Sequence, residues 1–194
     1  MAAAFDFSEL SPDLILDACQ HYGFYAESGL LALNSYENRV YQFKADDGLR
    51  YVVKFYRPQR WSTAQILEEH QFAAELVAAD VPVVAPLAVK GKTLLQFAGY
   101  SFALFPSRGG RTLEIDNDEQ LAMLGRFLGR LHQVGKAKPF LHRPAFSIES
   151  HLLQSRDVLH ALEFIPAYLR PAFDTVLNQV IELAAQQYQP RQLI

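Results

Sequence analysis

Hydrophobic and polar positions divide the chain into a strand-rich first part and a helical second part. Short segments that alternate in polarity, or that are rich in β-branched and aromatic residues, predict strands. These segments lie at residues 30–33, 40–43, 51–56, 87–89, 93–97 and 100–105. Tight turns are expected at Asp46-Asp47-Gly48 and Lys90-Gly91-Lys92. The first three of these segments have the pattern of an antiparallel meander.

Apolar residues at three- and four-residue spacing predict the helices. The first helix begins at Ser11-Pro12-Asp13, a serine cap followed by proline, and ends at Gly23. The second is the amphipathic stretch 63–79, whose predicted apolar stripe is Ile66, Leu67, Phe72, Leu76 and Val77. After a break at 106–110, further helices are predicted at 118–134, 148–162 and 166–187.

The order of these elements predicts an α+β fold with two lobes. Residues 1–105 would form a β-rich lobe with one long inserted helix. Residues 106–111 would form the linker, and residues 112–194 would begin a helical lobe.

Composition narrows the class of function. Of the 194 residues, 50% are hydrophobic and 20% are charged, as in soluble globular proteins. The net charge of −3 offers no basic surface for nucleic acid. Cys19 is the single cysteine, so it has no internal disulfide partner and is interpreted as a small buried residue. With no signal peptide pattern and no apolar run long enough for a bilayer, we expect a cytoplasmic protein without membrane contact.

Lys54 stands in the otherwise apolar strand segment 51–56. A lysine there costs free energy unless its ammonium reaches water or meets an acid. Glu68 and Glu69 in the next helix are the candidate acids, and Glu69 is preferred because Phe72 continues its helical face. A strand lysine held by a helix glutamate grips nucleotide phosphates in kinases. The alternative is an edge-strand lysine in water and a solvated acidic helix face.

Two further segments fit a nucleotide site. Asn34 and Ser35, between the first two strands, can donate to phosphate oxygens, although no glycine-rich G-x-G-x-x-G is present. Phe105 and Ser107 mark a strand end that would hold adenine between apolar side chains and backbone groups. A plain polar hairpin and an ordinary strand end are the alternatives. The six histidines show no metal-ligand spacing, so no metal site is predicted.

Taken in order, these segments resemble one family. The sequences at 33–43, 51–58 and 66–72 carry the resemblance, and those at 105–107, 109–111, 128–132 and 141–144 continue it. They resemble the stress response kinase A family of bacterial Ser/Thr protein kinases, within the aminoglycoside phosphotransferase and choline kinase superfamily. The resemblance covers essentially the whole chain.

The resemblance implies a protein-kinase-like fold in which residues 1–105 bind nucleotide. It implies an enzyme that uses ATP and magnesium to phosphorylate Ser or Thr of protein substrates, as a cytoplasmic monomer in envelope and oxidative stress responses. It also implies that Ser35 contacts ATP, that Lys54 binds phosphate, and that Glu69 holds Lys54.

The sequence departs from the family at one motif. A catalytic loop of the His-Gly-Asp type, with its following Asn and metal-binding acids, does not occur in the 194 residues. Since phosphoryl transfer depends on these acids, we expect no catalytic residue and no magnesium ligand here, and nucleotide binding without transfer. The helical lobe should be incomplete, with apolar residues such as Ile181 and Leu183 exposed.

Two other hypotheses stay open at the level of sequence. The first keeps the fold but makes the phosphate acceptor a small molecule, such as an aminoglycoside, choline or homoserine. The second is a non-catalytic module, like a pseudokinase, that binds a nucleotide or a protein partner.

Overall fold

The computed structural model describes residues 6–110 and 112–187, which fall into two compact units divided between Ala137 and Lys138. Arg111, the last residue of the predicted linker, lies outside the described residues, as do the termini at 1–5 and 188–194. The rest of that linker lies inside the first unit, because helix α3 (Asp118–Gly135) contacts helix α2 (Thr63–Ala78). The division into lobes at 106–111 therefore stays a prediction.

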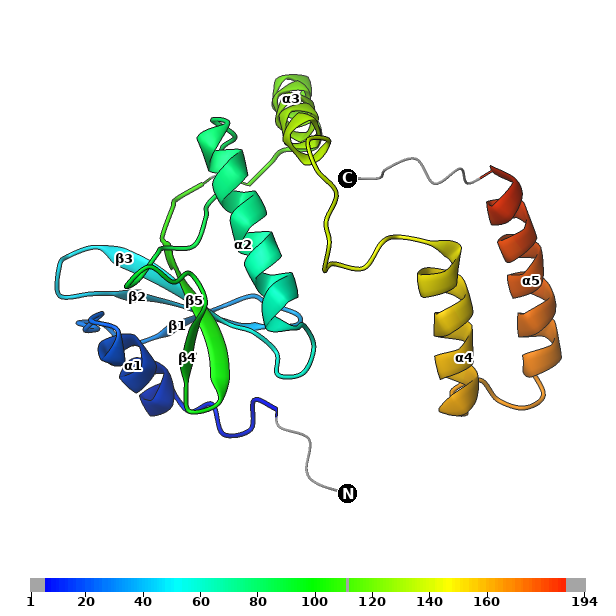
Figure 1. Cartoon of the computed structure of the whole chain (residues 1–194), viewed down its shortest axis with the longest axis horizontal. Coiled ribbons are helices and arrows are strands. Elements are labelled where there is room, and N and C mark those ends of the chain that lie inside the picture. Colours follow the sequence, from blue (N-terminus) through cyan, green and yellow to red (C-terminus); the bar gives the residue numbers. More distant parts are fainter. Residues whose placement is uncertain (1–5, 111, 188–194) are drawn as a thin grey trace. The chain divides into compact units, whose positions relative to one another are not determined.

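The first unit is built on a five-stranded antiparallel sheet in the order β1-β2-β3-β5-β4 (Figure 1). Its strands are β1 (Leu31–Leu33), β2 (Arg39–Lys44), β3 (Arg50–Phe55), β4 (Leu95–Phe97) and β5 (Tyr100–Pro106). Ala98 and Gly99 join β4 to β5 with φ of 47° and 84°, as a two-residue hairpin turn requires. The predicted meander is confirmed for β1, β2 and β3, whereas β5 rather than β4 pairs with β3.

The predicted strand at 87–89 is wrong. The structure has there an isolated bridge between Val89 and Lys92, and a hydrogen bond of 2.7 Å from the Leu87 N–H to the Leu104 carbonyl. The predicted strand at 93–97 begins only at Leu95.

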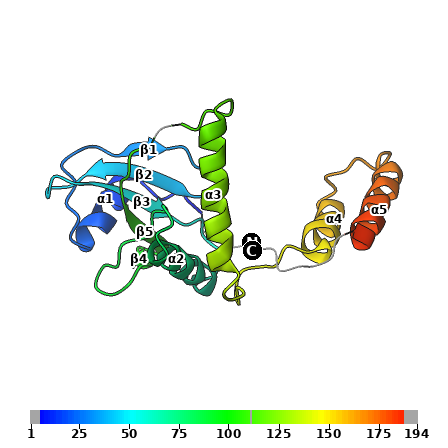
Figure 2. The same ribbon diagram turned by 90° about the horizontal axis from the view of Figure 1, so that it is seen from above.

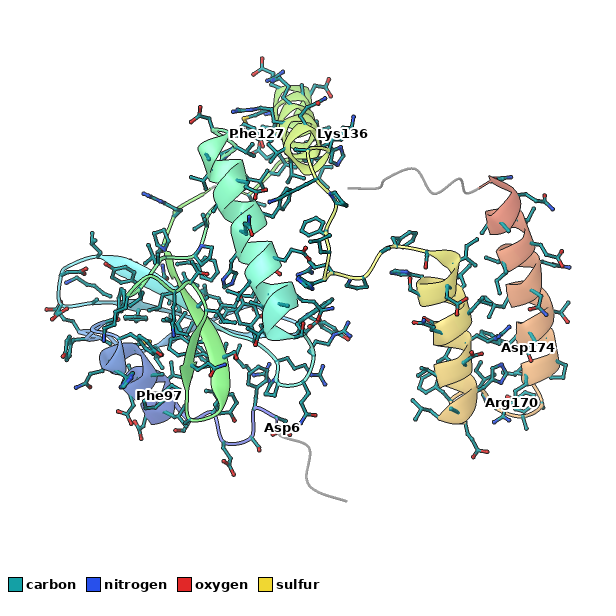
Figure 3. All side chains as sticks on the ribbon, in the orientation of Figure 1. Asp6, Phe97, Phe127, Lys136, Arg170 and Asp174 are labelled. Atoms are coloured by element: carbon teal, nitrogen blue, oxygen red, sulfur yellow. The ribbon has the colours of Figure 1, made fainter. Side chains whose placement is uncertain are left out.

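The sheet separates two sets of buried side chains. On one face, alternate residues of the strands, including Val53, Phe55 and Phe102, pack against helix α1 (Pro12–His21). Cys19 of α1 is fully buried there, as expected, and burial raises the pKa of its thiol to about 12. On the other face, Ala103 joins a smaller cluster that includes residues of α2 and its surroundings. Figure 3 shows side chains filling the space around the sheet.

Both helices that cover the sheet begin at serine caps. The Ser11 hydroxyl accepts a hydrogen bond of 3.2 Å from the Leu14 N–H, as predicted for α1. Ser62 and Gln65 form a reciprocal capping box at the start of α2.

The predicted apolar stripe of α2 needs a correction. Leu67 and Val77 are 42% and 45% exposed, whereas His70 is 3% exposed and faces inward. The buried side of α2 runs through Ile66, His70 and Leu76, at four- and six-residue steps. The polar residue His70 therefore belongs to the buried side of α2, and Leu67 does not.

Helix α3 is held to α2 at one end. The Arg130 guanidinium donates to the backbone carbonyls of Ala79 and Asp80, at 3.0 and 2.6 Å, which follow the last turn of α2. A cation at the C-terminal end of a helix also interacts favourably with the helix dipole. Figure 2 shows one end of α3 at α2, which it contacts.

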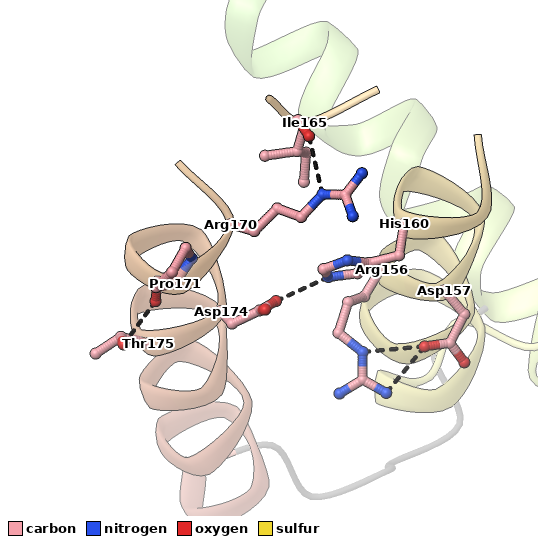
Figure 4. A network of polar contacts seen from close by, with 8 residues as sticks. All are labelled: Arg156, Asp157, His160, Ile165, Arg170, Pro171, Asp174 and Thr175. Atoms are coloured by element: carbon pink, nitrogen blue, oxygen red, sulfur yellow. Dashed lines mark hydrogen bonds and ion pairs between the residues drawn. The ribbon is translucent and has the colours of Figure 1, made fainter. Parts of the chain in front are cut away.

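The second unit consists of a π-helical turn, η1 (Glu149–Leu153), that continues into α4 (Gln154–Ala161), and of α5 (Arg170–Gln187). The His160 ring joins α4 to α5 through Asp174, with Nε2 and Oδ1 2.8 Å apart (Figure 4). Leu183 is 56% exposed, as expected, and Ile181 is half-buried. Among the described residues, no helix is long and apolar enough to cross a bilayer.

Candidate functional site

A cleft of about 420 Å³ opens on the sheet face that carries Lys54. Its lining comes from the sheet, from α2, and from the segments before β4 and after β5: Val40, Val52, Lys54, Glu69, His70, Ala73, Val84, Pro86, Phe105, Pro106 and Arg108. A larger hollow of about 560 Å³ lies among loops at Tyr36, Arg57 and Gln59. We assign the smaller cleft as the site because apolar walls and charged groups meet there, as in small-molecule sites.

The register of the sheet places Lys54 in the cleft. Lys54 pairs with Val40 on one side and with Ala103 on the other, so these residues share a face. Its neighbour Val53 points to the opposite face and is fully buried. The alternation therefore directs the lysine away from the α1 core and toward α2.

Lys54 is held by Glu69 and by an aromatic ring. Lys54 Nζ lies 3.2 Å from Glu69 Oε1, and the two side chains are 23% and 41% exposed. The same ammonium lies 4.6 Å from the centre of the Tyr56 ring. Of the two acids considered, Glu69 makes this ion pair. A pair this exposed contributes at most about 1 kcal/mol to stability, so its main effect is to orient the ammonium.

His70 is the residue after Glu69 in α2 and contacts Tyr56. The sequence analysis did not predict it as a site residue. Its Nε2 is 2.6 Å from the Tyr56 hydroxyl, and its Nδ1 is 2.9 Å from Thr93 Oγ1. Burial lowers the pKa of His70 to about 4, with opposing contributions from Glu69, which raises it, and Lys54, which lowers it. The four-residue step from Ile66 was the available signal that this histidine faces inward.

The predicted residues of the loop between β1 and β2 are not among those that line the cleft. Asn34 is exposed and Ser35 is half-buried, and the cleft is lined instead by Val40, opposite Leu33 in the sheet. The loop is anchored on its other side, where Glu37 Oε1 accepts a hydrogen bond of 2.7 Å from Trp61 Nε1.

Phe105 and Ser107, the two residues predicted at the strand end, differ in their contacts. Phe105 lines the cleft, but Ser107 turns toward the sheet, where its hydroxyl accepts from Gln42 Nε2 at 2.6 Å and its N–H donates to the Arg50 carbonyl at 2.9 Å. Backbone groups alternate between the two edges of a strand. Since the Leu104 carbonyl faces away from β3, toward Leu87, the Pro106 carbonyl faces that same edge.

Pro106 and Arg108 are thus cleft residues that the sequence did not single out. The Pro106 carbonyl is available as an acceptor by this alternation, and proline adds no donor of its own. The signal that distinguishes Pro106 from Ser107 was the alternation of backbone groups between the two edges of the strand.

No cluster of metal ligands stands out in the part of the chain that the structure describes. No three His, Cys, Asp or Glu side chains gather there as they would around a metal ion. Glu69 is the acidic residue among those that line the cleft, and its carboxylate is already paired with Lys54. These residues do not form a magnesium site by themselves.

Comparison with known proteins shows the family of the chain. The sequence pattern of a family described as phosphotransferase enzymes matches residues 30–194. Stress response kinase A from Escherichia coli K12 is 50% identical over 179 residues, which are 92% of this chain and 55% of that protein. Serine/threonine protein kinase RdoA from Salmonella typhimurium is 52% identical over 183 residues, 92% of this chain and 56% of that protein. The chain spans about half the length of the curated relatives it matches.

Solved structures share the fold. An amicoumacin kinase in complex with AMP-PNP, Ca²⁺ and Ami superposes with a TM-score of 0.68 at 22% identity, over 94% of this chain and 55% of that one. A spectinomycin phosphotransferase in complex with ADP and spectinomycin gives 0.60 at 14% identity, over 93% of this chain and 60% of that one. The α+β, protein-kinase-like fold expected from the sequence is confirmed.

Proposed function

Because the chain belongs to the phosphotransferase enzyme family, we propose that its first unit binds ATP in the cleft beside Lys54. The observation that carries the proposal is the ion pair between Lys54 and Glu69 in a cleft that also has apolar walls. Kinases use this combination of strand lysine and helix glutamate to grip nucleotide phosphates.

The rest of the cleft suits the other end of a nucleotide. Val40, Val52 and Phe105 offer apolar surface for adenine, and the Pro106 carbonyl can accept a hydrogen bond from its amino group. Asn34 and Ser35 would donate to the phosphates from the β1–β2 loop once that loop closes over them. A volume of about 420 Å³ lies within the range of small-molecule sites.

The complete activity proposed is transfer of the ATP γ-phosphate to Ser or Thr of protein substrates in a bacterial stress response. The names of the relatives at 50% and 52% identity support it. The proposal includes a monomer in the cytoplasm, where ATP is available. Magnesium would accompany the ATP phosphates and neutralise their charge, and we assign it no ligand among the described residues.

The 194 residues contain no His-Gly-Asp sequence. Within the proposal, these residues therefore bind nucleotide and do not transfer phosphate by themselves. Phosphate incorporation into a protein substrate by this purified chain would contradict that part of the proposal.

Isothermal titration of the 194-residue chain with ATP and with adenosine tests the binding site. Lys54→Met should weaken ATP binding about 10- to 100-fold, the worth of a charge-assisted hydrogen bond, and leave adenosine binding within about twofold. Lys44→Met is the matched control, because Lys44 also leaves the sheet to meet an acid, Glu27 at 3.0 Å, outside the cleft. Equal ATP affinity in the wild type and in Lys54→Met would refute the proposal.

A further inference from the structure

His70 is a buried polar side chain with two specific partners. It is 3% exposed, follows Glu69 in α2, and lines the same cleft. Burying a polar group without hydrogen bonds costs about 1–3 kcal/mol, and both ring nitrogens avoid this cost by meeting a hydroxyl. The ring is therefore fixed in two directions at once, toward Tyr56 at 2.6 Å and toward Thr93 at 2.9 Å.

These two hydrogen bonds connect three parts of the first unit. Tyr56 directly follows β3, and Thr93 lies shortly before β4. His70 therefore connects α2 to the segment that precedes it and to the segment that follows it. A side-chain tip lies about 5–6 Å from the axis of its helix, so a rotation of about 20° displaces it by about 2 Å. Such a displacement would break the 3.2 Å contact between Glu69 and Lys54. The rotation of α2 thus decides whether the ion pair forms.

Tyr56 carries the same constraint directly to Lys54. Its hydroxyl contacts His70, while its ring lies 4.6 Å from Lys54 Nζ. A cation over an aromatic face gains about 0.5–2 kcal/mol, in addition to the small contribution of the exposed ion pair. One buried side chain therefore contacts both the histidine and the lysine.

The neutral form of the imidazole fits this arrangement. A neutral ring donates from one nitrogen and accepts at the other, and the Tyr56 and Thr93 hydroxyls can each serve in either role. A protonated ring would donate from both nitrogens and would place a second cation near Lys54. The lowered pKa of His70, due first to its burial, keeps the ring neutral at pH 7.

We propose that His70 is a positioning residue for nucleotide phosphates, whose bonds to Tyr56 and Thr93 fix the rotation of α2 at which Glu69 holds Lys54. The inference rests on the proposed function, in which Lys54 binds the phosphates of ATP. In this proposal His70 acts through its neighbours Tyr56 and Glu69.

Titration of the 194-residue chain with ATP and adenosine separates positioning from general structure. His70→Phe keeps a ring but loses both hydrogen bonds, and it should weaken ATP binding about five- to tenfold while adenosine binding changes less than about twofold. His70→Gln places an amide near the position of Nε2, restores the contact with Tyr56, and should recover ATP affinity to within about twofold. Tyr56→Phe keeps the ring under Lys54 and should resemble His70→Phe.

The outcomes that overturn the inference are distinct from those that overturn the proposed function. Equal losses for ATP and adenosine in His70→Phe, or no loss for either, would refute positioning. If that variant does not fold, Tyr56→Phe carries the same test, and unchanged ATP affinity there refutes it. An effect of His70→Phe on ATP affinity together with none of Lys54→Met would instead reject Lys54 as the phosphate ligand.

Discussion

Acidification from pH 7.5 to 4.5 should destabilise the first unit through His70. The pKa of this histidine is about 4 in the folded chain, against 6.5 for an unperturbed histidine. Between these values the unfolded chain binds a proton that the folded chain does not. The stabilising effect is therefore complete above pH 6.5 and is lost as the pH falls toward 4.

The expected size follows from the difference between the two pKa values. Each pH unit in this window removes up to about 1.4 kcal/mol from the free energy of unfolding, which gives at most about 3 kcal/mol by pH 4. Relaxation of the folded chain around a protonated ring lowers this upper value, so we expect about 1–3 kcal/mol. This is a large share of the roughly 5–15 kcal/mol that stabilises an ordinary domain.

Urea unfolding followed by the fluorescence of Trp61, the single tryptophan, measures this loss at a series of pH values. His70→Gln is the control, because it keeps the contact with Tyr56 and does not titrate. The carboxylates with shifted pKa values act below the window: hydrogen bonds from the Tyr51 hydroxyl and the Leu49 N–H hold the pKa of Asp47 below its usual 3.8. Parallel loss of stability in the wild type and in His70→Gln between pH 6.5 and 4.5 would refute this reasoning.

Three smaller changes test other parts of the structure. Glu69→Gln should weaken ATP binding about five- to tenfold whereas Glu68→Gln should change it less than twofold, as measured by isothermal titration; the reverse order would mean that Glu68 orients the lysine. Ser62→Ala removes one half of the capping box and should lower the free energy of urea unfolding by about 1 kcal/mol, a loss that Ser62→Asp should largely avoid. Asp174→Asn keeps the shape of its side chain but weakens the contact with His160, so hydrogen exchange in α4 and α5 should accelerate; unchanged exchange would show that apolar contacts alone hold these helices.

The strands around the site were predictable because their alternation is strong. β3 places apolar residues on one face and Lys54 on the other, so the period of two alone directs the lysine away from the α1 core. The choice of Glu69 over Glu68 followed from helical spacing in the same way. Periodicity within one element was sufficient for both.

The features that the sequence did not predict depend on contacts between elements. His70 reads as polar in a hydrophobic pattern, and only the positions of Tyr56 and Thr93 make its burial favourable. Ser107 is not among the residues that line the cleft, and its hydroxyl and N–H are bonded to Gln42 and Arg50, which belong to other strands. No local pattern contains these partners.

The bonds of Arg130 to the end of α2 have a mechanical consequence. Its guanidinium holds the carbonyls of Ala79 and Asp80, about 15 Å along the helix axis from Glu69. Since α2 is one continuous helix from Glu69 to this contact, we expect a displacement of α3 to be passed along α2 to the carboxylate that holds Lys54.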